Sequence, residues 1–401
     1  MKKSLAFLSA LSFATAGFAQ APPEAPGLKF TGFLQYRYEY TEHPRFTAEE
    51  AGDAYSSDAG SAAIDNKSET STQLALFVDN QFDGHTRFHG WLQGQHLSGR
   101  TTNTYVTVNE AYVAAKFGPA EVAVGRFLSD VGLGTLGGAP FMDGIHLSLG
   151  NKMVAAQLYV TKFGAAKSTY AKATYPTTNG GYLQDTHMTF VSGDVKVMPM
   201  PGLTVGAAYF ADVTSADAST NYKSFSVFGE YKYVANNIPW FSVQGEYAKN
   251  NGDNAKFLGS FDGRTASDKA PKAWFVKGKI LGANPFMPGT GGISLQYRKA
   301  DAGFDAMGMA DPFAWNAPFN WTTPAQGGCA DNHKGFELAG EITVLPRTIV
   351  KAAYGIMKTV NNTAFLDLGN TQSPLGGLME LYTPANTDKQ NYLTASVFYL
   401  F

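Results

Sequence analysis

The sequence has little cysteine, little charge and only one long apolar run. Its 401 residues include a single cysteine, Cys329, so intramolecular disulfides cannot stabilise the fold. After residue 21 no apolar stretch reaches the roughly 20 residues that a transmembrane helix needs. Charged residues make up 16%, and a formal net charge of -2 gives no reason to expect a nucleic-acid partner.

Motifs that carry enzyme chemistry are also missing. Although the chain has 7 histidines and 33 acidic residues, it contains no HExxH, GxSxG or CxxC sequence. Gly132-Leu133-Gly134 is not followed by the spacing of a dinucleotide-binding loop. We therefore predict a protein that is not an enzyme and that needs no cofactor or metal.

The one long apolar run, Leu5–Phe18, follows two lysines and precedes Ala19-Gln20-Ala21. A charged start, a short apolar segment and an Ala-x-Ala exit are typical of a secretory signal peptide. The sequence therefore predicts a signal peptide at 1–21, a short spacer at 22–27 and an exported domain at 28–401.

What the sequence does contain is glycine (43), aromatic residues (13%) and alternation. Residues 28–40 place mostly apolar side chains at every second position and mostly polar ones between them. This run is longer than the five or six residues usual in soluble sandwiches and suits a tilted membrane-crossing strand of about 9 to 11.

The alternation recurs along the whole chain. About sixteen strands are predicted, an even number as single-chain bacterial barrels require. Their expected ranges are 28–41, 70–82, 86–97, 105–117, 120–127, 142–149, 152–162, 185–197, 202–213, 223–234, 239–250, 271–281, 291–301, 333–345, 347–359 and 389–401.

The connections between these strands alternate between short and long. Short links such as 83–85, 118–119 and 345–346 are separated by long polar ones such as 42–69 and 302–332. Outer-membrane barrels have short periplasmic turns and longer extracellular loops. The sequence thus predicts an all-β fold, a transmembrane antiparallel up-and-down β-barrel.

The two faces of the strands indicate which side meets water. One face carries charges of both signs around the circuit, as suits a water-filled lumen, although the solvated face of a soluble sandwich would look similar. The apolar face carries tyrosines, mostly near strand ends, where a membrane-interface girdle needs amphipathic rings. The aromatics favour the membrane barrel.

Two segments carry a family resemblance. The last strand ends with Val397, Tyr399 and Phe401 on one face, which resembles the carboxy-terminal signal of bacterial outer-membrane proteins. Residues 110–126, ending in Val124-Gly125-Arg126, resemble a hairpin of the Gram-negative general porins. The resemblance implies sixteen strands, recognition by the barrel-assembly machinery, homotrimers, and a third loop, near 128–141, folded into the barrel.

By that resemblance, Arg126 matches a wall arginine at the constriction that faces acidic loop residues, here Asp130 and Asp143. Strict alternation, however, sends Arg126 to the apolar face, and a bulge at Gly125 or a place near the rim of the barrel would be needed to keep it at the constriction. The other pore-lining candidates, taken from the polar face, are Arg37, Arg87 and Arg298.

Three functional hypotheses follow. The first is an outer-membrane porin through which small polar solutes and ions diffuse passively, in contact with outer-membrane lipid and lipopolysaccharide. The second is a solute-specific channel of the same barrel type, for a sugar or small organic anion, with an aromatic ladder along the lumen (Phe33, Phe77, Trp91, Tyr112 and Phe210). A barrel adhesin or enzyme is the third.

Overall fold

The computed structural model describes residues 27–41, 67–97, 104–133, 141–164, 187–213, 223–235, 238–252, 270–301, 304, 333–360 and 391–401. The predicted signal peptide and most of the long connections lie outside these residues. Among the described residues, no helix is long and apolar enough to cross a membrane.

Sixteen strands form the part of the fold that these residues make up, and each prediction of a strand is confirmed with bounds that differ by at most a few residues. They are β1 (Gly27–Thr41), β2 (Lys67–Gln81), β3 (Thr86–Leu97), β4 (Thr104–Phe117), β5 (Ala120–Leu128), β6 (Phe141–Gly150), β7 (Val154–Gly164), β8 (His187–Met200), β9 (Leu203–Asp212), β10 (Lys223–Ala235), β11 (Ile238–Asn250), β12 (Lys272–Leu281), β13 (Gly291–Ala300), β14 (His333–Leu345), β15 (Thr348–Thr359) and β16 (Tyr392–Leu400).

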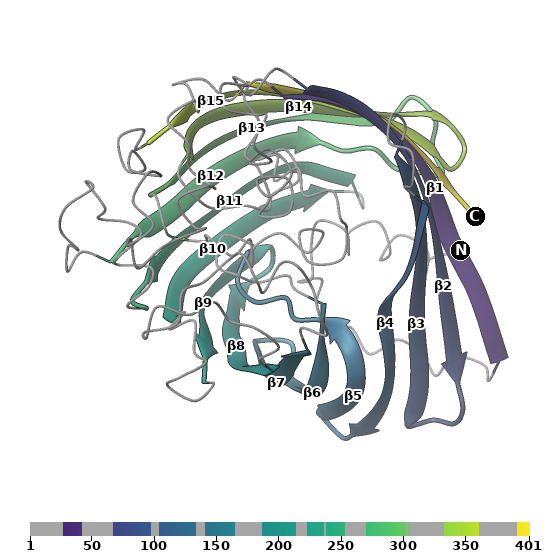
Figure 1. Ribbon diagram of the computed structural model, residues 1–401, viewed down its shortest axis with the longest axis vertical. Coiled ribbons are helices and arrows are strands. Elements are labelled where there is room, and N and C mark those ends of the chain that lie inside the picture. The colour runs from purple at the N-terminus through teal and green to yellow at the C-terminus, as the bar shows by residue number, and fades with distance from the viewer. Residues whose placement is uncertain are drawn as a thin grey trace, which may run out of the picture.

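The strands close into a ring (Figure 1). Each strand pairs antiparallel with its neighbours in sequence, and β1 pairs with β16. Beyond the end of β16, Gly32 and Phe401 exchange two backbone N–H···O bonds of 3.1 Å each. The predicted up-and-down barrel is therefore confirmed, and closure leaves the sheet without an open edge.

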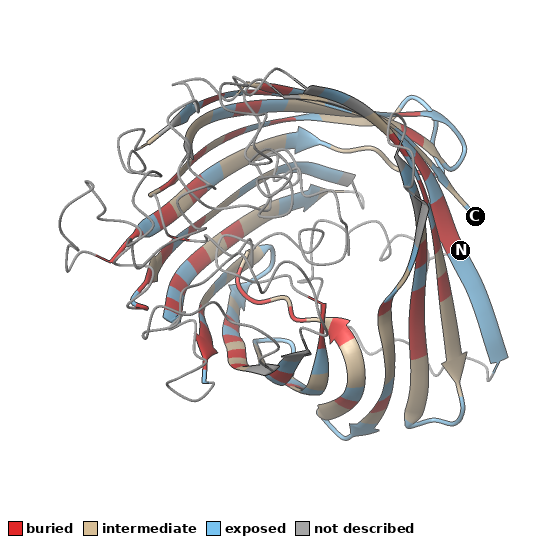
Figure 2. Cartoon of the chain, in the orientation of Figure 1, coloured by how far each residue is buried: buried red, intermediate tan, exposed pale blue. Residues whose placement is uncertain are grey.

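The barrel has an apolar outer face and a polar inner face. Along β13, Ile293 and Leu295 are 61% and 54% exposed, whereas the neighbouring Gln296 is 6% exposed and faces the inside. The same banding of buried and exposed residues runs along β10 (Figure 2). A soluble sandwich would bury its apolar face instead, so the structure excludes that alternative.

Short turns close one end of the barrel, and two of them are built on a polar side chain. Asp83 Oδ1 accepts the backbone N–H groups of His85 (2.7 Å) and Thr86 (2.6 Å), and these bonds hold the pKa of Asp83 below its usual value. Asn151 Oδ1 accepts the N–H groups of Met153 and Val154 in the same way. These side chains fix the turn backbone and with it the register of the hairpins.

Gly125 in β5 adopts a backbone conformation that favours glycine. Its φ is +139°, and a Cβ atom there would lie 2.3 Å from the carbonyl oxygen of Ala111 and 2.7 Å from Cα of Tyr112. The register of β5 with both neighbours is nevertheless continuous, so no bulge exists at this position. The glycine is needed for close packing of β4 on β5.

We expect Gly125→Ala to destabilise the barrel by about 1–3 kcal/mol, because the added methyl group meets backbone atoms. Gly278→Ala is the matched control, since a Cβ atom added at that strand glycine would have no atom within 4 Å. Denaturant unfolding followed by tryptophan fluorescence measures both. Equal free energies of unfolding for the two variants would contradict this account.

Candidate functional site

The five residues that directly follow β5 lie inside the ring. Residues 129–133, which we name the anchored segment, run from β5 toward β8 and β10 (Figure 2). The backbone N–H of Gly132 donates to Asp194 Oδ2 on β8 (3.1 Å), and that of Leu133 donates to Glu246 Oε2 on β11 (2.9 Å). At Gly132, where φ is +72°, a Cβ atom would lie 2.3 Å from Glu246 Oε1. Glycine therefore allows the close approach of loop and wall.

The two accepting carboxylates are themselves held by the wall. Asp194 lies 3.1 Å from Lys196 Nζ and accepts from Gln157 Nε2 (3.0 Å). Ser226 Oγ donates to Glu246 Oε1 (2.6 Å). Because both carboxylates are buried and hydrogen-bonded, they hold the anchored segment in one place.

Asp130, in the anchored segment, has a perturbed pKa. Burial in this crowded site, together with the negative charges of Asp194 and Glu246, raises the pKa of Asp130 to about 7, while Lys196 opposes the rise. The main-chain carbonyl of Asp130 accepts from Gln157 Nε2 (2.6 Å). The charge of Asp130 therefore changes near neutral pH.

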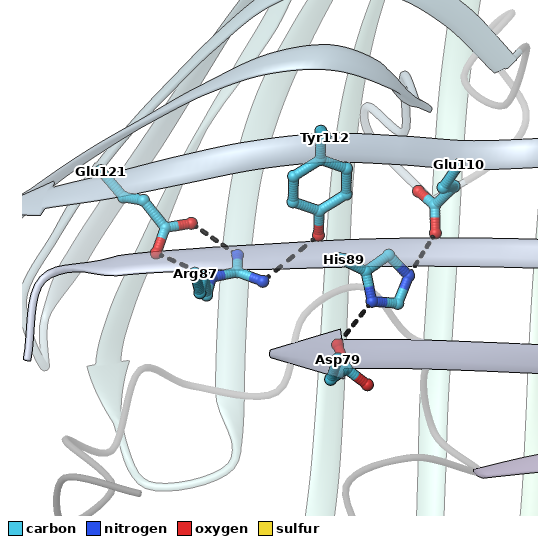
Figure 3. A network of polar contacts seen from close by, with 6 residues as sticks. All are labelled: Asp79, Arg87, His89, Glu110, Tyr112 and Glu121. Atoms are coloured by element: carbon cyan, nitrogen blue, oxygen red, sulfur yellow. Dashed lines mark hydrogen bonds and ion pairs between the residues drawn. The ribbon is translucent and has the colours of Figure 1, made fainter. Parts of the chain in front are cut away.

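A second polar network lines the inner wall of β2–β5 (Figure 3). Arg87 donates to both oxygens of Glu121, at 2.7 Å and 3.3 Å, and its Nη1 lies 3.4 Å from the hydroxyl oxygen of Tyr112. The guanidinium carbon also lies 5.4 Å from the centre of the Tyr112 ring. Paired in this way, Arg87 is fixed against the wall.

His89 bridges two acids in the same network (Figure 3). Its Nδ1 lies 2.7 Å from Asp79 Oδ1 and its Nε2 lies 3.1 Å from Glu110 Oε2. The other oxygen of Glu110 accepts the backbone N–H of Leu128 (2.9 Å), at the point where β5 ends. The network therefore holds Leu128, the residue directly before the anchored segment.

A basic cluster lies on the inner wall of β12–β15: Lys277, Lys279, Arg298 and Lys351. Lys279 Nζ is 2.8 Å and Lys351 Nζ 3.9 Å from oxygens of Glu341, and Tyr392 donates to the nearby Glu337. Lys277 has no ion pair with any described residue. This part of the wall therefore carries more positive than negative charge.

The structure places most of the predicted site residues on the inner side. Arg37 follows the buried Gln35 on the inner face of β1, and Arg298 is 7% exposed on the inner face of β13. Arg87 lies in the network above, and Asp130 in the anchored segment. These four residues come from separate parts of the inner side and do not form one cluster.

Arg126 and Asp143 lie elsewhere, on the outer face. They are directly opposite each other in the register of β5 and β6, and Arg126 Nη1 is 3.4 Å from Asp143 Oδ2. They share the phase of Val124 and Ile145, which are 56% and 52% exposed. Neither residue is therefore among the inward-facing side chains, because the register of β5 is continuous through Gly125 and the bulge that would turn Arg126 inward is absent.

The expected aromatic ladder is a packed cluster. Phe33, Phe77 and Trp91 touch in succession, and Trp91 meets Phe141, where β6 begins, with 5.3 Å between ring centres. All four are at most 7% exposed. Tyr112 joins through His89, whereas Phe210 packs on Phe190 in another part of the wall. The cluster therefore packs the first residue of β6 against the inner side of β1–β3.

Sequence reasoning missed the residues that hold the anchored segment: Gln157, Asp194, Lys196, Ser226 and Glu246. Their positions on the polar face of each strand indicated that they face inward, but not what they bind. The contact itself was not predictable, because Gly132 and Asp194 are 62 residues apart and Leu133 and Glu246 are 113 apart.

The raised pKa of Asp130 gives a pH-dependent stability. Because the folded pKa exceeds the unfolded value of 3.8, ionisation opposes folding, and stability should fall as pH rises from about 4 to about 7. Asp130→Asn should flatten that part of the profile and raise the melting temperature at pH 8. Thermal unfolding between pH 4 and 8 tests this, and a variant that follows the parent profile at every pH would refute it.

The chain matches no protein-family model and no curated protein sequence. Solved structures resemble it over almost the whole chain. Salmonella typhi OmpF, in a complex with daunomycin, is 14% identical and covers 94% of this chain and 98% of its own, with a TM-score of 0.53. Pseudomonas putida OprB, at high pH, is 11% identical and covers 94% of both chains, with a TM-score of 0.52.

A mutant of the Rh. blastica porin is 10% identical, covers 94% of this chain and all of its own, and has a TM-score of 0.50. At such identities the likeness concerns the backbone arrangement, not the residues of a site. The chain has the closed sixteen-stranded barrel fold of the porins.

Proposed function

We propose that this protein is an outer-membrane porin through which small hydrophilic solutes and ions diffuse passively. The observation that carries the proposal is the combination of a closed ring, apolar outside and polar inside, with a loop segment fixed within it. The outer face suits lipid, and the inner face suits water. The anchored segment would narrow the passage.

Fixed charges on the wall would then sort solutes. The walls carry both signs: Asp79, Glu110 and Glu121 with Arg87 on one part, and the basic cluster of β12–β15 on another. In a wide pore, selectivity comes from the diameter and from the field at the narrowest point. We expect weak ion preference overall, with Arg37, Arg87, Asp130 and Arg298 as pore-lining residues.

A solute-specific channel is the second candidate. Such a channel would guide its solute over exposed rings, whereas Phe33, Phe77 and Trp91 are buried in their own cluster. This burial favours the general porin. We also propose contacts with outer-membrane lipid and lipopolysaccharide, and a homotrimer. The barrel-assembly machinery would recognise the exposed Val397 and Tyr399 on β16 and Phe401 directly after it.

Single-channel recording in a planar bilayer tests the proposed function. The purified, folded barrel should give stepwise, ohmic conductance, and no simple sugar should block the current in a saturable way. Conductance steps in threes would support the trimer. Saturable block by one sugar would instead favour the solute-specific channel. A folded barrel that inserts and passes no current would overturn both candidates.

The basic cluster predicts a change in selectivity. Lys277→Gln with Arg298→Gln should shift the reversal potential in a salt gradient toward cation preference, because two inward-facing positive charges are lost. Lys162→Gln is the control, since Lys162 is exposed on the outer face of β7. An unchanged reversal potential in the double variant would show that this wall does not face the path of the ions.

A further inference from the structure

The outer face of the barrel carries a row of lysines on six consecutive strands, at the ends that lead into the long connections. We name it the lysine row: Lys223 (β10), Lys249 (β11), Lys272 (β12), Lys299 (β13), Lys334 (β14) and Lys358 (β15). Lys249 lies directly opposite Lys272, and Lys334 lies directly opposite both Lys299 and Lys358. These positions are therefore lateral neighbours.

Each of these lysines lies two positions along its strand from an apolar or aromatic residue of the same face. The partners are Phe225, Tyr247, Trp274, Tyr297, Phe336 and Ile356. Phe225, Tyr247, Phe336 and Ile356 are more than 40% exposed on the outer side. The Trp274 and Tyr297 ring centres are 5.1 Å apart, and those of Tyr297 and Phe336 are 4.7 Å apart. Five aromatic residues and Ile356 thus lie beside the lysine row, and we name them the aromatic row.

Like charges placed opposite each other destabilise a sheet unless an anion lies between them. Asp301 supplies one carboxylate, 3.5 Å from Lys299 Nζ, and its other oxygen accepts the backbone N–H of Lys272 (3.1 Å). The other five lysines form no ion pair with a described residue. The row therefore has an excess of positive charge that an anionic partner would stabilise.

Neighbouring lysines without an acidic residue between them are concentrated in this sector of the ring. On β1 and β2 the corresponding outer positions are Tyr38, Tyr40, Ser68 and Thr70, which are uncharged. On β5–β7 the outer row is mixed, with Asp143 between Arg126 and Lys162. A general need for solubility would spread lysines around the circuit, whereas a binding surface would gather them.

We propose that the lysine row binds the phosphate groups of outer-leaflet lipids, while the aromatic row packs at the level where headgroup meets acyl chain. This inference rests on the proposed membrane location. Aromatic belts mark membrane interfaces, and lysines just beyond them extend their ammonium groups toward lipid phosphates. The partner must be a lipid and not a soluble anion, because only a lipid contacts both rows at once.

Binding of lipid A to the folded full-length barrel in neutral detergent tests the inference. Native mass spectrometry would give the affinity for lipid A that carries both phosphates and for the same glycolipid without phosphate. The variant is K249Q/K272Q/K334Q/K358Q, and the matched control changes the same four lysines to arginine. A polybasic surface loses about fivefold in affinity per lysine, so we expect roughly a hundredfold loss or more in the glutamine variant and little change in the arginine one.

Equal binding of the two glycolipids by the parent barrel, or unchanged binding by the glutamine variant, would overturn the lipid site. Displacement of lipid A by inorganic pyrophosphate at a similar concentration would also overturn it, because the lysine row would then be a site for soluble anions. Conductance of the glutamine variant in a phosphatidylcholine bilayer should equal that of the parent. A parent barrel that conducts but binds both glycolipids equally would refute the lipid site alone. A folded parent barrel that passes no current would refute the porin.

Discussion

Closure of the sheet between β1 and β16 is the constraint on which the rest of this structure depends. A strand edge in an apolar surrounding would leave backbone N–H and C=O groups without partners, and each such group costs several kcal/mol. The pairing from Phe33–Leu400 to Thr41–Tyr392, extended by the two bonds between Gly32 and Phe401, removes that edge. In a closed ring, successive side chains of each strand point alternately to the outer and the inner face. The alternation of apolar and polar residues therefore makes one face apolar and the other polar.

The inner face is ordered by carboxylates that reach backbone amides. Asp194 and Glu246 accept from the anchored segment, and Glu110 accepts from Leu128 where that segment begins. Each of these acids is in turn held by a basic or hydroxyl partner on the wall. The aromatic cluster around Trp91 packs the other end of the connection, at Phe141. Polar pairing thus holds the anchored segment in place, and apolar packing holds the first residue of β6.

The fold was largely predictable from sequence, because alternation and connection length both depend on local composition. The long alternating run of β1 and the short Leu345-Pro346 link needed no knowledge of distant residues. The site was less predictable. Alternation placed Arg126 outside, as the structure has it, whereas the resemblance placed it at the constriction. From the sequence, Asp194 and Glu246 could be placed on the polar face of their strands, but their contact with the anchored segment could not be predicted. Which strands a loop contacts depends on the path of the loop and not on the alternation within the strands.

The central claim is that the apolar face of the barrel points outward and the polar face inward. The most direct test is spin-label accessibility along β13 in a lipid bilayer, with labels on single cysteines in a Cys329→Ser background. Labels at Ile293 and Leu295 should be accessible to oxygen, which concentrates in lipid. Labels at Ser294 and Gln296 should be accessible to a water-soluble nickel complex. This alternation would support a polar passage inside an apolar wall. If the two sets show the same accessibility, or the opposite one, the polar face does not enclose water and the account is wrong.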